Sequence, residues 1–477
     1  MFNSRYRQIH FVGIGGIGMS GIAEVLLTLG YRVTGSDVKR SDATRRLTRH
    51  GAKIFRGHNK SNVEDAHVVV VSSAIDGKNP EVKEAIKQGI SVVSRAEMLA
   101  ELMRLKYAVA VAGTHGKTST TSMVSTILNT AGLDPTVIIG GKVNSFRTNA
   151  RLGKGDLLVA EADESDMSFL KLTPTIGIIT NIDADHLENY RDFDHLQQSF
   201  VDFANKVPFY GSVVCCTDHP VVKKIVPKIE RRCITYGLKG ADYCCQNVIQ
   251  DQGKLSFDVV HDGEHLGSIR MDQVGEHHAL NALAAIAVAR ELDVSFTMIR
   301  RALKAYRGVA RRFQILNKPT ADDPIVVDDY AHHPVEIAAT IKAARDSWPE
   351  RRIVAVIQPH RYSRLAAHFN DYVKSLKGAD IVVVMDVYSA GEKPHAGITG
   401  EKLWRRVHRA YPKKTVAFAA NHEQAKEITT SWIGPQDMIL FLGAGDITKL
   451  AKTVAKEVAT PARPPQKKKR KKKARRN

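Results

Sequence analysis

A strand, a glycine turn and a helix in direct succession most constrain how this 477-residue chain can fold. The apolar residues 108–112 lead into the turn 113–119 (GTHGKTS), and a helix is predicted over 118–130. Backbone N–H groups of such a turn surround phosphate oxygens, a lysine neutralises a phosphate in transfer, and a threonine hydroxyl binds Mg²⁺. The usual loop has a glycine five positions before Gly116, where this chain has Val111. We therefore predict an α/β domain that binds ATP through a shortened loop.

Two polar segments follow other apolar strands of the same region. They are the acidic residues 161–166 and the segment 180–186, which ends in a histidine. Because the carboxyl ends of parallel strands meet at one edge of a sheet, we expect both segments near Lys117. In isolation an acidic loop is usually solvated and a lone histidine structural. Next to a phosphate loop, Glu161 is expected to bind a nucleotide-bound Mg²⁺ and His186 a second ion.

A second glycine turn lies near the amino terminus. Residues 13–18 (GIGGIG) follow the predicted strand 8–12, and Asp37 ends a second strand about twenty residues later. This spacing is typical of NAD sites, so an NAD-dependent dehydrogenase is one alternative. That reading gives Lys117, Glu161 and His186 no role. The helix amino terminus suits any nucleotide diphosphate, including UDP.

The chain is too long for one hydrophobic core, and its length suggests about three domains. Apolar strands alternate with helical stretches throughout, which predicts α/β folding with parallel sheets. We place the boundaries at residues 1–106, 107–313 and 314–458, followed by a tail at 459–477.

The charge distribution sets the tail apart. The formal net charge is +20, and about half of it lies in residues 461–477, where two prolines lead into a run of lysine and arginine. Such a segment repels itself and is expected to be disordered. It is either a solvated appendage or a weak contact for nucleic acid or anionic lipid, and a nucleic-acid-binding protein is a third hypothesis.

Composition also bears on the compartment. No apolar run approaches the roughly 20 residues needed to cross a bilayer, and no export signal is recognised at the amino terminus. The five cysteines are odd in number and lack CxxC spacing. A cytoplasmic, reducing location is expected.

From about residue 8 to residue 458 the chain resembles the Mur ligases. Its motifs occur in the order found in that family: 113–119, 161–166, 180–186, 277–281 (HHALN), 311–313 (RRF), 328–334 (DDYAHHP) and 358–364 (QPHRYSR).

The resemblance implies three domains: a Rossmann-like UDP-binding domain, a central P-loop ATPase-type domain and a Rossmann-like carboxyl-terminal domain. It implies an ATP-dependent ligase that phosphorylates the lactyl carboxylate of UDP-N-acetylmuramate and joins the resulting acyl phosphate to L-alanine. Mg²⁺, with two ions expected, would be the cofactor. A recycling ligase that attaches a whole tripeptide to the same UDP-sugar is the nearest alternative.

The resemblance also assigns sites. Positions matching the ATP site are Gly113, Thr114, His115, Gly116, Lys117, Thr118, Ser119, His278, Asn281, Arg312 and Asp329. Positions matching the UDP-sugar site are Gly15, Gly16, Gly18, Asp37, Ser72 and Ser73. Those matching the amino-acid site are His332, Arg361 and Arg364; the metal positions are Thr118, Glu161 and His186; and the catalytic set is Lys117, Glu161, His186 and His332.

Two of these assignments have plain structural alternatives. His278 and Asn281 lie on an Ala-rich predicted helix, where they could equally be packing residues. Arg361 and Arg364 could be ordinary surface charge, although two arginines three residues apart can also form a fork for a carboxylate.

Overall fold

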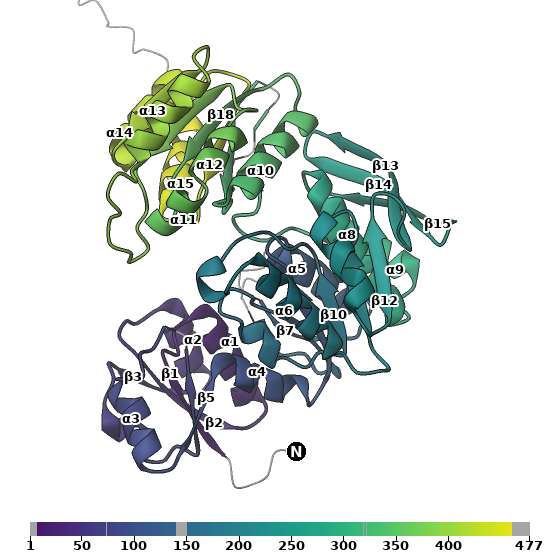
Figure 1. The fold of residues 1–477 in the computed structure, drawn as a ribbon, viewed down its shortest axis with the longest axis vertical. Coiled ribbons are helices and arrows are strands. Elements are labelled where there is room, and N and C mark those ends of the chain that lie inside the picture. Colours follow the sequence, from purple (N-terminus) through teal and green to yellow (C-terminus); the bar gives the residue numbers. More distant parts are fainter. Residues whose placement is uncertain (1–6, 73, 140–149, 318, 321, 460–477) are drawn as a thin grey trace, which may run out of the picture. The chain divides into compact units, whose positions relative to one another are not determined.

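Three β-sheets organise the chain (Figure 1). The computed structural model describes residues 7–72, 74–139, 150–317, 319–320 and 322–459. Ser73 and the predicted tail from residue 460 onward lie outside these ranges. The chain divides into two compact units, residues 1–312 with two of the sheets and residues 313–477 with the third. The predicted boundary near residue 106 falls inside the first unit and stays a prediction.

The first sheet is parallel, with strand order β3-β2-β1-β4-β5. Its order reverses between β1 and β4, and ligands of open α/β sheets bind in the crevice at such a reversal. The strands are β1 Gln8–Val12, β2 Arg32–Asp37, β3 Lys53–Arg56, β4 Val68–Val71 and β5 Ser91–Ser94. The helices are α1 Ile17–Thr28, α2 Asp42–Arg49, η1 Lys60–Val63, α3 Pro80–Lys87 and α4 Arg95–Met103.

Helix starts in this region follow capping chemistry. Ser41 and Ser94 each form a capping box with the residue three positions later, and Asn79 accepts from the backbone N–H of Glu81 ahead of Pro80. These side chains satisfy backbone donors that have no partner within the helix.

The second sheet has ten strands in the order β15-β14-β13-β12-β11-β10-β6-β9-β7-β8. The strands are β6 Tyr107–Ala112, β7 Thr136–Ile138, β8 Ala150–Arg151, β9 Leu157–Glu161, β10 Ile176–Ile179, β11 Ser212–Cys216, β12 Cys233–Gly237, β13 Tyr243–Asp251, β14 Lys254–His261 and β15 Glu264–Met271. The helices are α5 Lys117–Thr130, η2 Ser168–Lys171, η3 Leu187–Asn189, α6 Phe193–Asn205, α7 Pro220–Ile225, η4 Val226–Lys228, α8 Glu276–Glu291 and α9 Phe296–Ala305.

The centre of this sheet explains why the phosphate turn is rigid. β6 lies between β10 and β9, and residues 108–112 are fully buried. Helix α5 packs on α8, whose run of alanines permits close approach of the two backbones, and buried residues of both helices share one hydrophobic cluster. The turn is thus fixed on one side by the buried strand β6 and on the other by helix α5, which packs on α8.

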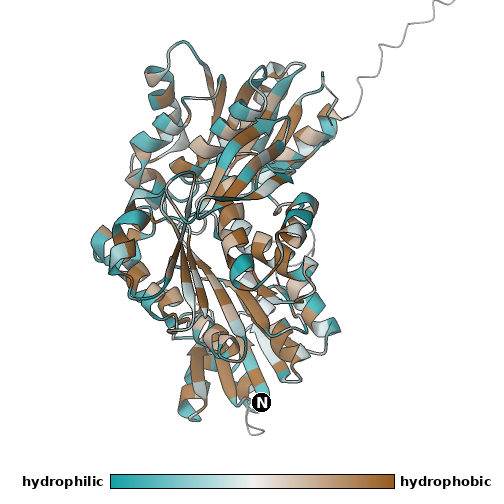
Figure 2. Ribbon diagram, turned by 90° about the vertical axis from the view of Figure 1, so that its right-hand side faces the viewer, coloured by the Kyte–Doolittle hydropathy of each residue, from teal (hydrophilic) through white to brown (hydrophobic). Residues whose placement is uncertain are grey.

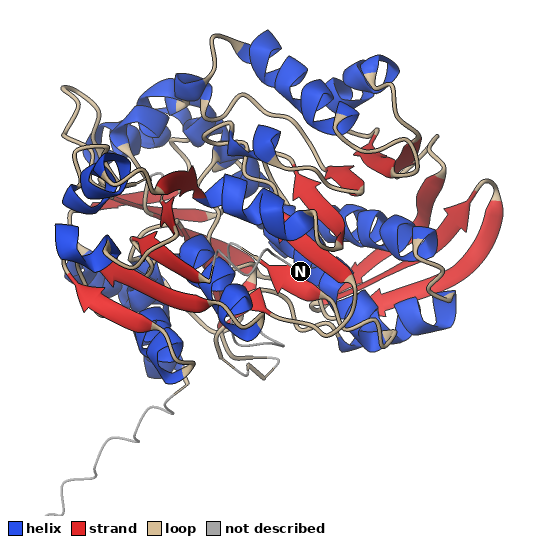
Figure 3. Cartoon of the chain, turned by 90° about the horizontal axis from the view of Figure 1, so that it is seen from below, coloured by secondary structure: helices blue, strands red, loops and turns tan. Residues whose placement is uncertain are grey.

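The expectation of parallel sheets is wrong for part of this region. Strands β13, β14 and β15 pair antiparallel and are visible as the long strands on the right-hand side of Figure 3. Much of β14 alternates between buried and less buried residues, as in a sheet with one face covered. No apolar run marks such strands, so the sequence pattern for buried parallel strands did not detect them.

The third sheet has the order β16-β17-β21-β18-β19-β20, parallel except for β16. Its strands are β16 Gln314–Ile315, β17 Ile325–Asp329, β18 Arg352–Ile357, β19 Ile381–Met385, β20 Thr415–Ala419 and β21 Asp437–Leu442. Its helices are α10 Pro334–Ser347, α11 Tyr362–Ala367, α12 Phe369–Ser375, α13 Gly400–Ala410, α14 His422–Trp432 and α15 Ile447–Val458.

The hydropathy of the residues differs between strands and helices. The strands are largely hydrophobic and many helices are hydrophilic on one side (Figure 2). Among the described residues, no helix combines the length and the apolar character that a membrane crossing requires.

Candidate functional site

The turn after β6 has a backbone that only glycine supports. Gly113 and Gly116 have φ of +131° and +84°, in the region unfavourable to side chains. A Cβ on Gly113 would lie 2.0 Å from Thr180 Oγ1, and one on Gly116 would lie 2.8 Å from Asn281 Oδ1. The turn is therefore packed against the end of β10 on one side and against α8 on the other.

Residues that follow β10 fix the turn by hydrogen bonds. The backbone N–H of His115 donates to Asn181 Oδ1 at 2.7 Å, and its carbonyl accepts from Thr180 Oγ1 at 2.6 Å and Asn181 Nδ2 at 3.0 Å. The Thr114 hydroxyl accepts from the backbone N–H of Asp183 at 2.9 Å. The predicted proximity of the segment 180–186 to the turn is thus confirmed.

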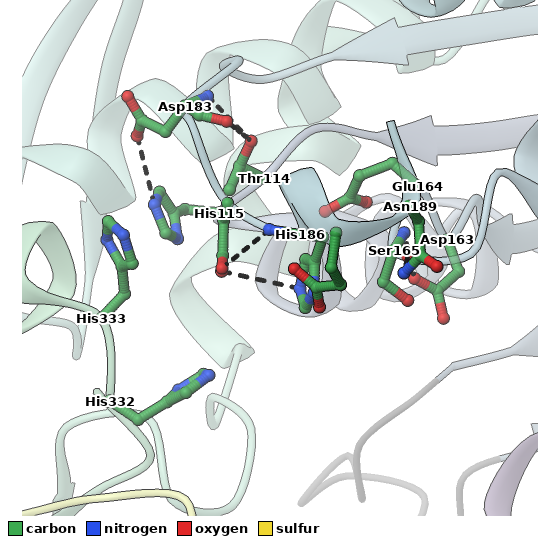
Figure 4. A network of polar contacts seen from close by, with 12 residues as sticks. Thr114, His115, Asp163, Glu164, Ser165, Asp183, His186, Asn189, His332 and His333 are labelled. Atoms are coloured by element: carbon green, nitrogen blue, oxygen red, sulfur yellow. Dashed lines mark hydrogen bonds and ion pairs between the residues drawn. The ribbon is translucent and has the colours of Figure 1, made fainter. Parts of the chain in front are cut away.

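Lys117, the first residue of α5, folds back over the turn. Its Nζ donates to the carbonyl of Gly113 at 2.6 Å and of Thr114 at 3.2 Å, and it lies 2.8 and 2.7 Å from the two carboxylate oxygens of Glu164. Glu164 follows β9 and is buried (Figure 4). The cation that a phosphate would need is present and is paired with a protein carboxylate.

Burial and neighbouring charges together set the pKa values of Lys117 and Glu164. Burial raises the pKa of Glu164 to about 7, against the attraction of Lys117. Burial also acts to lower the pKa of Lys117, but the nearby carboxylates of Glu164, Asp163 and Glu161 outweigh it, so the pKa of Lys117 is raised. The lysine is therefore charged at neutral pH, while its partner is close to its midpoint.

A second carboxylate, Asp183, links three strand ends. Its Oδ2 lies 3.1 Å from His115 Nε2 and its Oδ1 lies 3.3 Å from Nε2 of His219, which follows β11. Burial acts to raise the pKa of Asp183, but the hydrogen bonds from the two histidines hold it well below its usual range. Figure 4 shows Asp183 directed at the His115 ring. The ionised Asp183 carboxylate thus orients the ring of His115.

The predicted metal positions are distributed around this turn. Glu161 is the last residue of β9, Thr118 lies in the first turn of α5, and His186 has a left-handed backbone with its ring 3.5 Å from Asp185 and 3.7 Å from Glu188. Within the described residues, no three histidine, cysteine or acidic side chains form a ready-made metal cluster. Mg²⁺ commonly takes one or two protein oxygens and completes its shell with phosphate and water, and Thr118 and Glu161 are oxygen donors of that kind.

The predicted adenine-contacting residues lie on α8 behind the turn. Asn281 Oδ1 accepts from Thr120 Oγ1 at 3.2 Å and supports Gly116, which is a packing role. His278 Nδ1 donates to the carbonyl of Val274 at 2.7 Å. Burial, assisted by the charge of Arg312, lowers the pKa of His278 to about 4, so the ring is neutral and its Nε2 carries a lone pair. The structure thus shows a packing role for Asn281 and a neutral imidazole at His278.

The amino-terminal turn is built differently. Gly15 donates its backbone N–H to Asp37 Oδ2 at 2.9 Å, and a Cβ on Gly15 would meet that oxygen at 2.7 Å. Ser72 follows β4, and its Cβ lies 3.6 Å from the position a Gly13 Cβ would take. Gly16 and Gly18 open helix α1 as its N-cap and second residue. Apart from Ser73, the residues predicted for the UDP-sugar therefore gather where the strand order reverses.

In the second unit, the predicted amino-acid residues follow two strands. His332 follows β17, whereas Arg361 and Arg364 follow β18. The rings of His332 and His360 meet edge to face with centroids 5.6 Å apart, and burial, followed by the charges of His332 and the two arginines, lowers the pKa of His360 to about 4. His360 lies within the motif 358–364, but the sequence predicts no role for it.

Asp329, predicted for the ATP ribose, also belongs to the second unit. Its carboxylate accepts from the backbone N–H groups of Phe313 at 2.9 Å and Ala331 at 2.8 Å. Asp329 therefore fixes the backbone at Phe313, the first residue of this unit.

Three further residues of this site, Glu164, Asp183 and His219, are not among those predicted from the sequence. Glu164 and Asp183 lie within the predicted segments 161–166 and 180–186, whereas His219 lies outside them. A usable signal existed for His219, because the apolar residues 212–216 form another buried strand and the polar residues after it share the same edge.

Comparisons with known proteins agree with this architecture. Residues 8–107 match the model of the Mur ligase family catalytic domain, 111–289 that of the Mur ligase middle domain, and 311–445 that of the Mur ligase glutamate ligase domain. The chain is 51% identical over 455 residues to UDP-N-acetylmuramate–L-alanine ligase of Geotalea uraniireducens, covering 95% of this chain and 98% of the relative. The chain belongs to the Mur ligase family.

Other members of the Mur ligase family extend the comparison. The ligase of the same name from Geobacter sulfurreducens is 50% identical, with 93% of this chain and 96% of the relative covered. The crystal structure of UDP-N-acetylmuramate-alanine ligase from Thermotoga maritima superposes with a TM-score of 0.78 at 30% identity, covering 94% of this chain and 98% of that one. A murein peptide ligase from Psychrobacter arcticus shares the fold with a TM-score of 0.66 at 22% identity, with 96% and 99% of the two chains covered.

As a Mur ligase, the chain is an ATP-dependent enzyme that forms a carbon–nitrogen bond. The predicted α/β fold class with three family domains is confirmed. The dehydrogenase alternative for the amino-terminal turn is not needed, because the same turn forms part of the first Mur ligase domain.

Proposed function

We propose that this Mur ligase joins L-alanine to the lactyl carboxylate of UDP-N-acetylmuramate in peptidoglycan precursor synthesis, with ATP converted to ADP and phosphate. The similarity to ligases of that name, at about 50% identity over 95% of the chain, carries the proposal. The recycling ligase alternative has weaker support, since the murein peptide ligases among the solved structures are 22% and 29% identical to this chain, against about 50% for the L-alanine ligases.

The turn after β6 is the proposed site of phosphoryl transfer. A carboxylate oxygen of the UDP-sugar attacks the γ-phosphorus of ATP, the bond from that phosphorus to the β-bridging oxygen breaks, and ADP leaves. When a phosphate replaces Glu164 as the partner of Lys117, the ammonium group can stabilise the negative charge on the transferred phosphoryl group. Bound Mg²⁺, with Thr118 and Glu161 as its protein ligands and His186 at a second ion, would neutralise phosphate charge.

The second step makes the amide. The amine of L-alanine attacks the carbonyl carbon of the acyl phosphate, the carbon–oxygen bond to phosphate breaks, and the nitrogen loses a proton. In this proposal Arg361 and Arg364 hold the amino-acid carboxylate and His332 orients the amine. Phosphorylation is required because a free carboxylate is a poor acylating agent at neutral pH.

The site residues of the two nucleotides follow the same proposal. Gly15, Gly16, Gly18, Asp37, Ser72 and Ser73 would receive the UDP group, and His278, Asn281, Arg312 and Asp329 would contact the adenosine of ATP. The acceptor nitrogen of His278 suits the amino group of adenine. We place the reaction in the cytoplasm, in keeping with five free cysteines.

Phosphate release tests the proposal. Purified protein is given ATP, Mg²⁺ and UDP-N-acetylmuramate, with L-alanine, glycine, L-serine or the tripeptide L-Ala-γ-D-Glu-meso-diaminopimelate in turn. Release is expected with L-alanine and a new amide is expected in the product. Turnover with the tripeptide but not with L-alanine would establish the recycling ligase instead, and no release with any amine would refute both.

A further inference from the structure

A buried carboxylate that the proposed chemistry does not use lies beneath the amino-terminal glycine turn. Glu81, on α3, is fully buried. Its oxygens accept from Ser36 Oγ at 2.6 Å, His58 Nδ1 at 3.0 Å and Asn62 Nδ2 at 2.5 Å. His10, on β1, places Nε2 3.7 Å away. One carboxylate thus joins β1, β2, η1 and α3.

This carboxylate is ionised at neutral pH. Burial acts to raise its pKa, but the nearby His10 ring and the hydrogen bonds from Ser36, Asn62 and His58 outweigh burial and lower the pKa to about 2. A buried charge with this many donors fixes their positions, because each donor would lose a charge-assisted bond by moving.

Ser36 connects Glu81 to the turn. The side chain of Ser36 is bonded to Glu81, while its carbonyl oxygen accepts from the backbone N–H groups of Gly13 at 2.9 Å and Ile14 at 3.1 Å. The next residue, Asp37, holds the N–H of Gly15 at 2.9 Å. Two successive residues of β2 therefore bind three successive residues of the turn.

Packing leaves the turn little freedom at this point. A Cβ on Gly35, the residue before Ser36, would lie 2.6 Å from Ile14 Cδ1 and 2.8 Å from the carbonyl oxygen of Phe11. A small shift at the end of β2 must therefore be passed on to the turn.

We propose that Glu81 is a positioning residue of the UDP-sugar site, which sets the glycine turn through Ser36 without touching the ligand. The inference rests on the proposed function, because it takes the ligand of this turn to be a UDP-sugar. A turn that is fixed in position loses less conformational entropy when a diphosphate binds to its N–H groups, and the diphosphate therefore binds more tightly. Glu81 should therefore affect the UDP-sugar and not ATP.

The variant Glu81→Gln tests this directly. An amide can accept at one oxygen only, and its NH₂ group faces donors where the carboxylate accepted. We expect the KM for UDP-N-acetylmuramate and its dissociation constant from calorimetry to rise about tenfold. The kcat at saturation and the KM for ATP should stay within about twofold of wild type. Glu84→Gln is the matched control, because Glu84 lies on the same helix, is only partly buried and accepts from Gln88 Nε2 at 2.8 Å.

A second variant keeps the test decisive if Glu81→Gln fails to fold. Ser36→Ala retains the carbonyl that holds the turn but removes the link to Glu81, and we expect UDP-sugar affinity to fall about fivefold. If Glu81 acts through Ser36, the double variant should bind no more weakly than Glu81→Gln alone.

The outcomes separate the two proposals. Wild-type protein that does not bind the UDP-sugar would refute the proposed function. Wild-type binding with unchanged affinity in both single variants would overturn the role of Glu81. A parallel rise in both KM values together with a fall in kcat would show that Glu81 serves only the general fold.

Discussion

The two glycine turns of the first unit share a plan and differ in charge. Each follows a buried parallel strand and opens a helix, α1 in one case and α5 in the other. At the first turn a backbone N–H is bonded to Asp37, and the turn itself carries no cation. At the second, Lys117 is bonded to the turn and to Glu164.

This difference matches two tasks that a ligase must separate. A diphosphate that stays bound and unchanged needs only the fixed dipoles of a helix amino terminus. A phosphate in transfer changes its charge distribution, and a mobile lysine can follow it. We infer that the first turn determines how well the sugar nucleotide binds, whereas the second determines how fast phosphate moves.

Removing Lys117 should have the largest effect. Lys117→Ala deletes the only cation on the second turn, and we expect kcat to fall at least about 10³-fold because charge stabilisation in the transition state is lost. UDP-sugar affinity, measured by calorimetry, should stay within about twofold. Lys154→Ala, at an exposed loop position, is the control. Undiminished turnover would contradict the role of this turn.

Adding a methyl group to the second turn should have the next largest effect. In Gly113→Ala the Cβ would collide with Thr180 Oγ1, so the turn must distort, and we expect kcat/KM for ATP to fall about 10²-fold. Gly132→Ala is a matched comparison, since Gly132 also has positive φ but no neighbour near its Cβ position. If the two variants were equally active, close packing of the turn would not matter for catalysis.

Much of this comparison could be predicted from the sequence. The two turns, their strands and the polar segments after β9 and β10 were located, because apolar strands and glycine turns are local patterns. Helix starts were less accurate: α5 begins at Lys117, one residue before the predicted start at residue 118.

The partners of the turns could not be predicted in the same way. Glu164 meets Lys117 across 47 positions of sequence, and Glu81 meets Ser36 across 45. Such pairs depend on strand order, which local patterns do not determine. The antiparallel strands β13–β15 were missed for a related reason, since their alternating residues resemble those of a loop.

At the first turn, Asp37→Ala should have a moderate effect. The variant removes the acceptor for Gly15 and for the sugar nucleotide, and we expect the KM for UDP-N-acetylmuramate to rise about tenfold, the value of one charge-assisted hydrogen bond. The KM for ATP should not change. Asp65→Ala, at an exposed position of the same domain, is the control. A loss of ATP affinity in Asp37→Ala would show that the turns are not independent.

The smallest expected effect concerns pH at the second turn. The pKa of Glu164 is about 7, so the side chain is mostly protonated at pH 6 and mostly ionised at pH 8. The ionised form of Glu164 binds Lys117 and repels a triphosphate. The KM of the wild type for ATP should therefore rise about threefold from pH 6 to pH 8.

Glu164→Gln isolates this contribution from the titration of ATP itself. The amide is neutral throughout, so the KM of the variant should depend less on pH than that of the wild type, and the two should converge at pH 6. The first turn differs, because Glu81, the buried carboxylate behind it, is ionised over this whole pH range. The KM for the UDP-sugar should therefore be flat between pH 6 and pH 8 in both proteins. Parallel profiles for ATP would mean that Glu164 does not compete with phosphate for Lys117.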